Sequence, residues 1–290
     1  MTGLAVQTRG LVHVYRMEGQ DVAALAGVDL SIAPGETVCL LGPSGSGKST
    51  LLSLLGGLMR PSAGRIQIGS HDLSEMGPDD LDALRARDVG LMLQGGRRNL
   101  IPYLDARGNV DFARAAGARA AGAQAADGEP ATAALGPDEL LDLVGASDAA
   151  ALLPSAMTPG QAQLVAIAVA IACRPGLLLA DEPTAALSHL ARQRVLAALD
   201  QVNEASGATI VVVSHDDAVA RAMRRTVTIR DGRIGGEGRD GQEYAVVAAD
   251  GSLPLPPAAL EQLPPGSAVR VHRGDDGWSI IPVDAGGEGS

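Results

Sequence analysis

Aromatic residues are scarce in this chain, and no apolar run is long enough to cross a bilayer. Phe, Trp and Tyr make up 2% of the 290 residues although 46% are hydrophobic, so Leu, Val, Ile and Ala must fill the core. The longest apolar run, residues 164–173, is shorter than the roughly 20 residues that a transmembrane helix needs. No basic-then-apolar signal segment opens the sequence. We therefore expect a cytoplasmic polypeptide that reaches a membrane only through a partner.

Cysteine and basic residues are also limiting. The two cysteines, Cys39 and Cys173, lie in apolar runs, which favours reduced, buried thiols over a disulfide or a metal site. Lys and Arg number 23 against 34 Asp and Glu, a net charge of −11. This balance argues against a nucleic-acid partner bound through a basic surface. It leaves docking on a membrane protein open.

A glycine-rich run carries the main chemical signal. It fits the pattern G-x-x-x-x-G-K-[ST] and comprises Gly42, Pro43, Ser44, Gly45, Ser46, Gly47, Lys48, Ser49 and Thr50. An apolar run (residues 38–41) precedes it and a helical stretch (residues 51–59) follows, which is the context that a phosphate-binding loop needs. The loop's N–H groups and the helix N-terminus favour phosphate. Lys48 can reach the β- and γ-phosphates, and Ser49 can bind Mg²⁺.

Two carboxylates follow a second apolar run. Residues 177–180 read as a buried strand, and Asp181 and Glu182 come directly after it. Asp181 can hold the water shell of the metal, and Glu182 can polarise the attacking water. With the phosphate loop, this acidic strand end predicts that a nucleoside triphosphate is hydrolysed here.

Strand-like and helical segments alternate along most of the chain. Strands are expected at residues 4–16, 27–32, 38–41, 65–68, 89–93, 177–180 and 209–213, and helices at 48–59, 161–173 and 190–205. This order predicts a parallel sheet covered on both faces. Residues 225–230 and 232–234 read as a closing hairpin.

Composition divides the chain into three parts. Residues 1–237 form the expected α/β domain, with a helical insertion at about 95–160 that contains helices at 105–121 and 137–144 and a Gly/Ala-rich loop at 122–134. Residues 238–284 read as a small β-rich appendage, with strands at 243–248, 268–272 and 278–283 and a short helix at 258–263. Residues 285–290 are expected to be a disordered tail.

Further motifs follow in a fixed order. Gln94 comes after the strand at 89–93, Met157-Thr158-Pro159-Gly160-Gln161 precedes a helix, and His215 follows the strand at 209–213. With the phosphate loop and the acidic strand, this order resembles the nucleotide-binding subunit of ATP-binding cassette (ABC) transporters over about residues 4–236. The resemblance implies an α/β P-loop NTPase core of ABC type with an antiparallel β subdomain and a helical subdomain, with ATP and Mg²⁺ as ligands.

The resemblance also implies residue roles. Glu182, His215, Gln94 and Lys48 would be catalytic, His215 contacting the γ-phosphate. Ser49, Gln94 and Asp181 would serve the metal. Tyr15 would stack on adenine, with a half-buried strand tyrosine as the alternative. The nucleotide-binding set would include the signature residues Thr158, Gly160 and Gln161.

Family members pair head to tail, so that each ATP lies between one subunit's phosphate loop and the other's signature. The motifs for this chain's own ATP are intact, whereas those for the opposite ATP are altered: Pro159 replaces a signature glycine and loses an N–H donor, and Ser188 replaces the aspartate of the following loop, the D-loop. This asymmetry favours a heterodimer with a second cassette subunit. A homodimer that tolerates the changes is the alternative.

The run of residues 99–104, with Leu187 after the acidic motif, is similar to cassettes of the lipoprotein-release and macrolide-export group. In that group the cassette drives an integral membrane permease with a large extracytoplasmic domain, and the helical insertion near Pro102 and Tyr103 would grip it. The chain would then be peripheral on the inner face of the membrane.

The appendage resembles an AbrB-like swapped-hairpin module, a family that dimerises and often binds DNA. Residues 239–290 hold three basic residues against eight acidic ones, and DNA binding needs several Lys or Arg contacts to phosphate. We therefore expect dimerisation or regulation rather than DNA binding. A passive β extension is the alternative.

Two other function classes compete with a transporter ATPase. A soluble cassette of DNA repair or translation would carry long coiled coils or two cassettes, and this chain has neither. A catalytically weak or regulatory subunit is disfavoured because Glu182 and His215 are intact.

Overall fold

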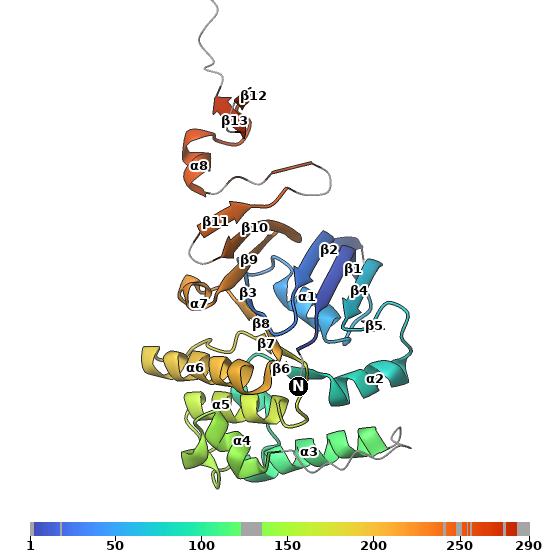
Figure 1. The fold of residues 1–290 in the computed structure, drawn as a ribbon, viewed down its shortest axis with the longest axis vertical. Coiled ribbons are helices and arrows are strands. Elements are labelled where there is room, and N and C mark those ends of the chain that lie inside the picture. The colour runs from blue at the N-terminus through green and yellow to red at the C-terminus, as the bar shows by residue number, and fades with distance from the viewer. Residues whose placement is uncertain are drawn as a thin grey trace, which may run out of the picture.

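The computed structural model describes residues 3–17, 19–122, 135–239, 242–247, 251–253, 255, 257–274 and 277–282. Figure 1 shows two sheets in the upper part of the molecule, with a layer of helices below them. The expected Gly/Ala-rich loop falls almost entirely at 123–134, and the expected tail at 285–290; both lie outside the described residues.

The larger sheet has seven strands in the order β11-β10-β9-β3-β8-β7-β6. These are β3 (Thr37–Leu41), β6 (Val89–Met92), β7 (Leu177–Asp181), β8 (Thr209–Ser214), β9 (Arg225–Arg230), β10 (Arg233–Arg239) and β11 (Gln242–Ala245). The five strands from β9 to β6 are parallel. The β9–β10 hairpin and β11 continue the sheet antiparallel.

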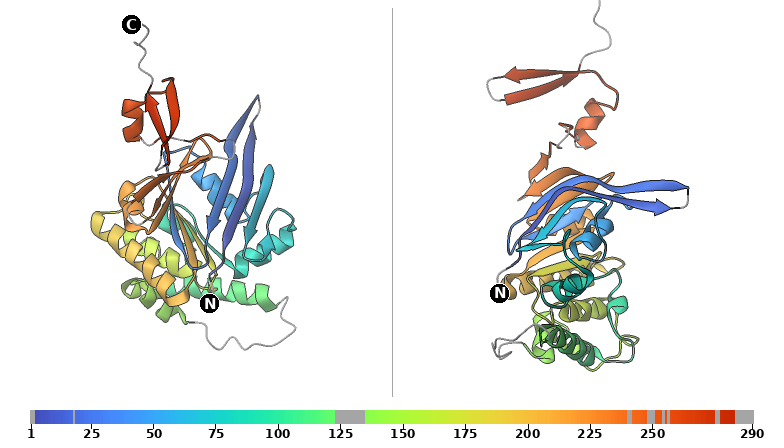
Figure 2. Two further views of the ribbon diagram at one scale, coloured as in Figure 1. Left: turned by 45° about the horizontal axis from the view of Figure 1, so that its top comes forward. Right: turned by 90° about the vertical axis from the view of Figure 1, so that its right-hand side faces the viewer.

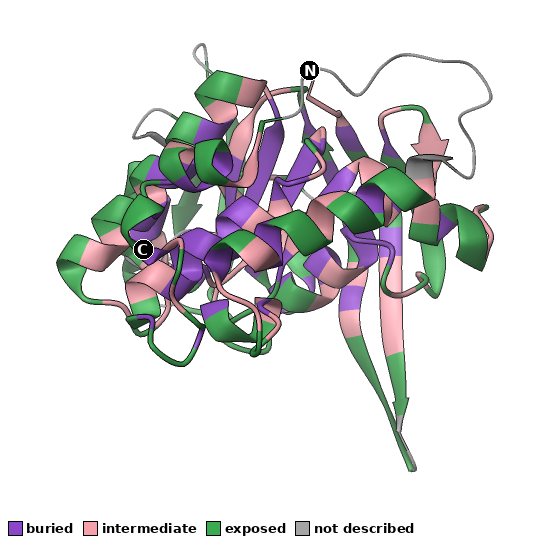
Figure 3. Cartoon of the chain, turned by 90° about the horizontal axis from the view of Figure 1, so that it is seen from below, coloured by how far each residue is buried: buried purple, intermediate pink, exposed green. Residues whose placement is uncertain are grey.

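Both faces of the parallel strands are covered, as predicted. Alternate residues of β7 and β8 enter two different cores: Leu178 and Ile210 face one, and Leu179 and Val211 face the other. Nearly every residue of these strands is buried (Figure 3), which explains their near-continuous apolar sequence.

The smaller sheet is antiparallel, in the order β2-β1-β4-β5. Its strands are β1 (Val6–Met17), β2 (Gln20–Ile32), β4 (Ala63–Ile68) and β5 (His71–Asp72). The far half of the β1–β2 hairpin extends beyond the body of the molecule (Figure 2). Its inner half shares one apolar core with α1 (Lys48–Leu55) and α2 (Pro78–Arg87), a helix that the sequence analysis missed.

The other face of the larger sheet is covered by helices. They are α3 (Ala106–Gly122), α4 (Pro137–Leu143), α5 (Pro159–Ala170), α6 (His189–Ser206) and α7 (Asp217–Ala222). Two 3₁₀ turns, η1 (Gly96–Asn99) and η2 (Ser147–Ala149), lie in the helical insertion. Within the described residues, no helix has both the length and the apolar content to cross a bilayer.

The larger sheet continues into the C-terminal segment, past the domain boundary expected at residue 237. β10 runs through that point to Arg239, and β11 pairs with it as the edge strand of the larger sheet, because the alternating sequence continues the hairpin pattern. Only α8 (Pro257–Gln262), β12 (Val269–Gly274) and β13 (Gly277–Pro282) stand apart from that sheet (Figure 1). The β12–β13 hairpin is exposed along both strands. Its resemblance to a swapped-hairpin module stays a prediction.

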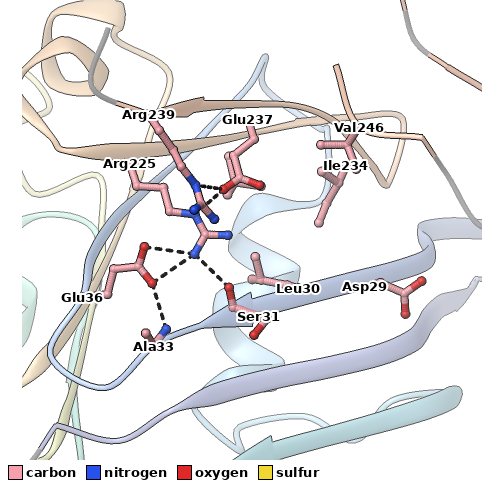
Figure 4. A pocket seen from close by; sticks show the side chains of 11 residues that line it. Asp29, Leu30, Ser31, Ala33, Glu36, Arg225, Ile234, Glu237, Arg239 and Val246 are labelled. Carbon is pink, nitrogen blue, oxygen red and sulfur yellow. Dashed lines mark hydrogen bonds and ion pairs between the residues drawn. The ribbon is translucent and has the colours of Figure 1, made fainter. Parts of the chain in front are cut away.

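An ion-pair network holds the turn before β3 against β9 and β10 (Figure 4). The Arg225 side chain is 9% exposed; its Nε donates to Glu237 Oε1 at 2.6 Å, and its Nη1 donates to Glu36 Oε2 at 3.0 Å and to the Ser31 carbonyl at 2.8 Å. Burial raises the pKa of Glu237, but hydrogen bonds from Arg239 and Arg225 outweigh burial and leave this pKa below its ordinary value. The network therefore joins both sheets by charge as well as by packing.

We predict that Arg225→Ala lowers the free energy of unfolding by about 2–3 kcal/mol, since it leaves two half-buried carboxylates without their shared donor. Urea unfolding at pH 7 measures this loss. Arg65→Ala is the matched control: that side chain is 71% exposed and 4.0 Å from Asp72, so its loss should cost less than about 0.5 kcal/mol. Equal unfolding midpoints for the two variants would contradict the prediction.

The comparison of wild type with Arg225→Ala also gives a test of pH dependence. A lowered pKa for Glu237 means that its contribution is present above the ordinary value of 4.5 and is lost as the pH falls through the folded pKa. The stability gap between wild type and Arg225→Ala should therefore shrink below about pH 4.5. A gap that grows on acidification would contradict this assignment.

Candidate functional site

The glycine-rich loop connects β3 to α1 and depends on two glycines with left-handed backbone. Gly42 has φ +155° and Gly47 has φ +100°. A Cβ at Gly42 would lie 2.2 Å from the Ile229 carbonyl, and one at Gly47 would lie 2.4 Å from the Ala24 carbonyl. Gly45 (φ +80°) instead faces open space. The loop is thus fixed by contacts with two other strands and leaves room above Gly45.

Lys48 is the only lysine in the chain, and it is 6% exposed. Its Nζ donates to the carbonyls of Gly42 and Pro43, each at 2.7 Å, inside its own loop. Burial lowers the pKa of Lys48, and the nearby carboxylates of Glu182 and Asp181 act in the opposite direction. The ammonium group is therefore held inside the concave side of the loop.

Asp181 ends β7 beside the first turn of α1. Ser49 Oγ donates to Asp181 Oδ1 at 3.3 Å. Burial raises the pKa of Asp181; the hydrogen bond from Ser49 lowers it, Glu182 raises it, and Lys48 lowers it. A hydroxyl and a carboxylate at this spacing are the oxygen ligands that Mg²⁺ uses beside phosphates and waters.

Glu182 and His215 form a direct pair at the same edge of the sheet. Glu182 Oε1 lies 2.7 Å from His215 Nδ1. Glu182 has a left-handed backbone (φ +49°), and its N–H donates to the Val213 carbonyl at 3.0 Å. Such strain in a non-glycine residue is typical of functional sites. The Glu182 side chain is 12% exposed, whereas His215 is 58% exposed.

Gln94 follows β6, the neighbour of β7, and is exposed. The turn after it is held by Asn99, whose Oδ1 accepts from the Leu93 N–H at 2.8 Å and whose Nδ2 donates to the Leu93 carbonyl at 2.8 Å. Gly96 packs so tightly on α5 that a Cβ there would lie 2.4 Å from Gln163 Oε1. The roles predicted for Gln94 in metal binding and catalysis stay predictions.

Tyr15 projects from β1 toward α1. Its Oη lies 3.2 Å from Thr50 Oγ1, and its ring meets the His13 ring edge to face at a centroid distance of 4.8 Å. The ring is 39% exposed. Tyr15 is therefore adjacent to the phosphate loop, where an adenine platform is expected, and its stacking role stays a prediction.

The signature run forms a capped helix start at α5. Thr158 is the N-cap: its Oγ1 accepts from the Gln161 N–H at 3.3 Å, and its own N–H donates to Gln161 Oε1 at 3.0 Å. Pro159 occupies the first helical position, where an N–H has no partner inside the helix and the fixed φ of proline is favourable. The substitution at Pro159 therefore preserves the helix start, although it still removes one donor.

A groove of about 340 Å³ lies beside this helix start. It is bounded by the signature on one side and by Leu187, Ser188 and Ala191 on the other. Ser188 caps α6, its Oγ accepting from the Ala191 N–H at 3.4 Å. The residue expected to replace a D-loop aspartate is thus a helix cap at the edge of the groove.

The structure adds two polar ties that the sequence analysis missed. Gln163 is buried and donates to the Pro183 carbonyl at 2.7 Å, and Arg97 donates to the Met157 carbonyl at 2.5 Å. Both join the insertion to the signature or to the acidic motif. In the sequence, Gln163 and Arg97 are marked only by lying close to motifs, and this closeness does not predict which carbonyls they bind.

The two cysteines are free thiols; burial was predicted for both and is found for Cys39 alone. Burial raises the pKa of Cys39 to about 12, so it stays a thiol under the site. Cys173 is half-buried, its Sγ donating to the Ala113 carbonyl at 3.4 Å.

The residues fit a nucleoside triphosphate with magnesium. The space above Gly45, the buried ammonium of Lys48 and the start of α1 suit a phosphate chain. Ser49 and Asp181, hydrogen-bonded to each other, would supply two oxygen ligands to the metal. Among the described residues, no group of three or more His, Cys, Asp or Glu side chains could by itself hold a metal ion.

Comparisons with known proteins agree with this reading. The family model described as ABC transporter matches residues 25–185. The macrolide export ATP-binding/permease protein MacB of Rhodopseudomonas palustris is 38% identical over 89% of this chain and 38% of its own length. The lipoprotein-releasing system ATP-binding protein LolD 1 of Caulobacter vibrioides is 35% identical over 81% of this chain and 96% of its own length.

Solved structures show the same fold. The ATP-binding cassette MJ0796, in a dimeric post-hydrolysis state bound to ADP and phosphate, aligns with a TM-score of 0.68 at 32% identity, over 81% of this chain and 98% of its own. The chain spans little more than a third of the macrolide-export relative.

We predict that Lys48→Ala weakens binding of a nucleoside triphosphate by at least about 100-fold, because charged hydrogen bonds to two phosphates are lost, each worth about 1.5–3 kcal/mol. Fluorescence titration with a labelled ATP analogue measures the dissociation constant. Arg65→Ala, on exposed β4, should bind normally. Unchanged affinity in a folded Lys48→Ala protein would remove Lys48 from the site.

Proposed function

This chain belongs to the ABC transporter family, and from that premise we propose that it binds ATP with Mg²⁺, hydrolyses the nucleotide beside Glu182, and thereby powers an integral membrane permease. The observation that carries the proposal is that the phosphate loop, Asp181, Glu182 and His215 follow three neighbouring parallel strands. Leu41 pairs with Ser214, and Asp181 pairs with Val213. The motifs therefore meet at one edge of the sheet.

The chain's own residues divide the work of hydrolysis. The loop N–H groups and Lys48 hold the β- and γ-phosphates, and Lys48 exchanges its bonds to the Gly42 and Pro43 carbonyls for phosphate oxygens. Glu182 accepts a hydrogen bond from the attacking water and takes its proton. The water oxygen forms a bond to the γ-phosphorus while the bond to the ADP oxygen breaks, and ADP leaves. His215 holds the Glu182 carboxylate and faces the γ-phosphate.

Ser49 and Asp181 would hold Mg²⁺, with Gln94 beside them. When bound, the metal supplies positive charge that offsets charge developing on the phosphate oxygens. The raised pKa of Asp181 fits a carboxylate that gains from a nearby cation.

The insertion offers a surface for the permease. Asn109 is buried and organises residues 101–105: its Oδ1 accepts from the Ile101 N–H at 2.6 Å, and its Nδ2 donates to the carbonyls of Leu104 and Asp105 at 3.0 and 2.9 Å. This turn presents Tyr103, 78% exposed, and the helix α3 that follows it carries Phe112, 53% exposed; both are rare residue types here. Exposed aromatic residues on a rigid turn and on the helix after it support a docking site for a permease.

This partner also sets the proposed location, peripheral on the inner face of the membrane. The permease would belong to the macrolide-export or lipoprotein-release group, as the names of the relatives suggest. Co-purification of the full chain with a polytopic membrane protein, lost in Tyr103→Ala, tests both. A full chain that co-purifies with no polytopic membrane protein would contradict them.

We predict that Glu182→Gln spares ATP binding and slows turnover by at least about 100-fold, because orientation of water and stabilisation of charge carry phosphoryl transfer. Steady-state phosphate release measures the rate, and the Lys48 binding assay measures affinity. Glu75→Gln, at an exposed carboxylate, is the matched control and should turn over normally. An unchanged rate in Glu182→Gln would mean that another group acts on the water.

The second cassette is proposed to be a different chain. Ser188 and Pro159 support this, because both lie on the groove that would face the opposite ATP and both lack groups that the family uses. In a Glu182→Gln background, the chain alone with ATP should stay monomeric in analytical ultracentrifugation. A stable ATP-dependent homodimer would defeat the heterodimer and favour the homodimer.

A further inference from the structure

The first turn of α6 touches the groove beside the signature. Ser188 caps this turn, and Ala191 lies so close to the signature that a Cβ at Gly160 would be 3.1 Å from the Ala191 Cβ. Both residues line the groove. A residue of a facing subunit that occupies the groove would therefore contact the first turn of α6.

The next residue of the same turn, Arg192, reaches the other half of the site. Its Nη1 lies 2.8 Å from Asp216 Oδ2. Asp216 directly follows His215 and caps α7, with Oδ1 accepting from the Ala218 N–H at 2.8 Å, while its own N–H donates to Ser214 Oγ at 3.1 Å. Arg192 thus holds the loop that positions His215.

The placement of Arg192 is unfavourable for stability in one respect. Arg192 Nε is buried and has no hydrogen-bond partner within the part of the chain that the structure describes. A buried donor without an acceptor costs about 1–3 kcal/mol. Arg192 is placed between the groove and the His215 loop in spite of this unfavourable free energy, which suggests that it does more than stabilise the fold.

We propose that Arg192 is a positioning residue that couples the signature groove to His215. When a facing subunit enters the groove, the first turn of α6 shifts, and the Arg192–Asp216 pair carries the shift to the His215 loop. The turn has contacts on both sides, so it is the physical element that both sites bias. This inference rests on the proposed ATPase function and deepens it.

Four variants test the pair. Arg192→Gln removes the charge, Asp216→Asn removes it while keeping an oxygen to cap α7, and their double variant measures coupling. Arg192→Lys keeps the charge. Arg107→Gln is the matched control, since it breaks a different inter-element pair, Arg107–Asp138, whose Nη2–Oδ1 distance is 2.7 Å.

Steady-state turnover gives the first readout, measured on the full chain assembled with the second cassette that the proposed heterodimer requires. Arg192→Gln and Asp216→Asn should each lower kcat on the order of 3- to 30-fold with KM unchanged. The double variant should be no slower than the slower single one, Arg192→Lys should recover most of the rate, and Arg107→Gln should match wild type. Unchanged kcat, or losses that multiply in the double variant, would overturn the proposal.

Histidine NMR gives the second readout, which a purely structural role would not move. The chain has five histidines, so a His215→Gln spectrum assigns the His215 signal. That signal should shift in Arg192→Gln at unchanged thermal stability, and an unshifted signal would overturn the proposal. If the assembly with the wild-type chain shows no turnover, the proposed function fails; if it turns over and the assembly with Arg192→Gln is equal to it, only the coupling fails.

Discussion

Parallel strands deliver their carboxyl ends to one edge of a sheet, and in this chain β3, β8 and β7 do so in matched register. Leu41, Ser214, Val213 and Asp181 lie at one level. The residues that follow them are Gly42, His215 and Glu182, so the same few hydrogen bonds position the phosphate loop and both members of the Glu182–His215 pair. A slip of one residue in either ladder would separate them.

Charge at this edge is balanced within a small, half-buried volume. Burial lowers the pKa of Lys48 and raises that of Asp181, and each of these groups partly offsets the shift of the other. The carbonyls of Gly42 and Pro43 hold the Lys48 ammonium. The loop is therefore preformed for phosphate, and little reorganisation is needed when phosphate oxygens replace those carbonyls.

Much of this arrangement can be predicted from sequence because it is local. The phosphate loop, the buried strands and the order of the motifs are written in short, contiguous patterns, and the family, fold class and ATP ligand follow from them and are confirmed. The helix α2 was missed although Pro78 at its start and Arg85 and Arg87 in its last turn are ordinary signals, because its mean character is polar and no apolar period marks it.

The remainder depends on contacts that sequence spacing does not encode. Arg192 and Asp216 pair across two elements, and Arg225 pairs with Glu36, in the turn before β3, and with Glu237, in β10. Pro159 looked like a pure loss in the sequence, but the structure places it at the first helical position, where proline is favourable. The expected boundary at residue 237 stays a prediction. A composition change marked the appendage, whereas strand pairing carries the sheet on to β11.

The central claim is that ATP binds beside Lys48. The chain offers a direct probe of this claim because it contains a single lysine. With ¹⁵N-lysine labelling, one side-chain signal reports on the site. Titration with a non-hydrolysable ATP analogue and Mg²⁺ should shift that signal to a saturating limit at one nucleotide per chain. A lysine signal that stays unmoved at millimolar analogue, in folded protein, would contradict the account.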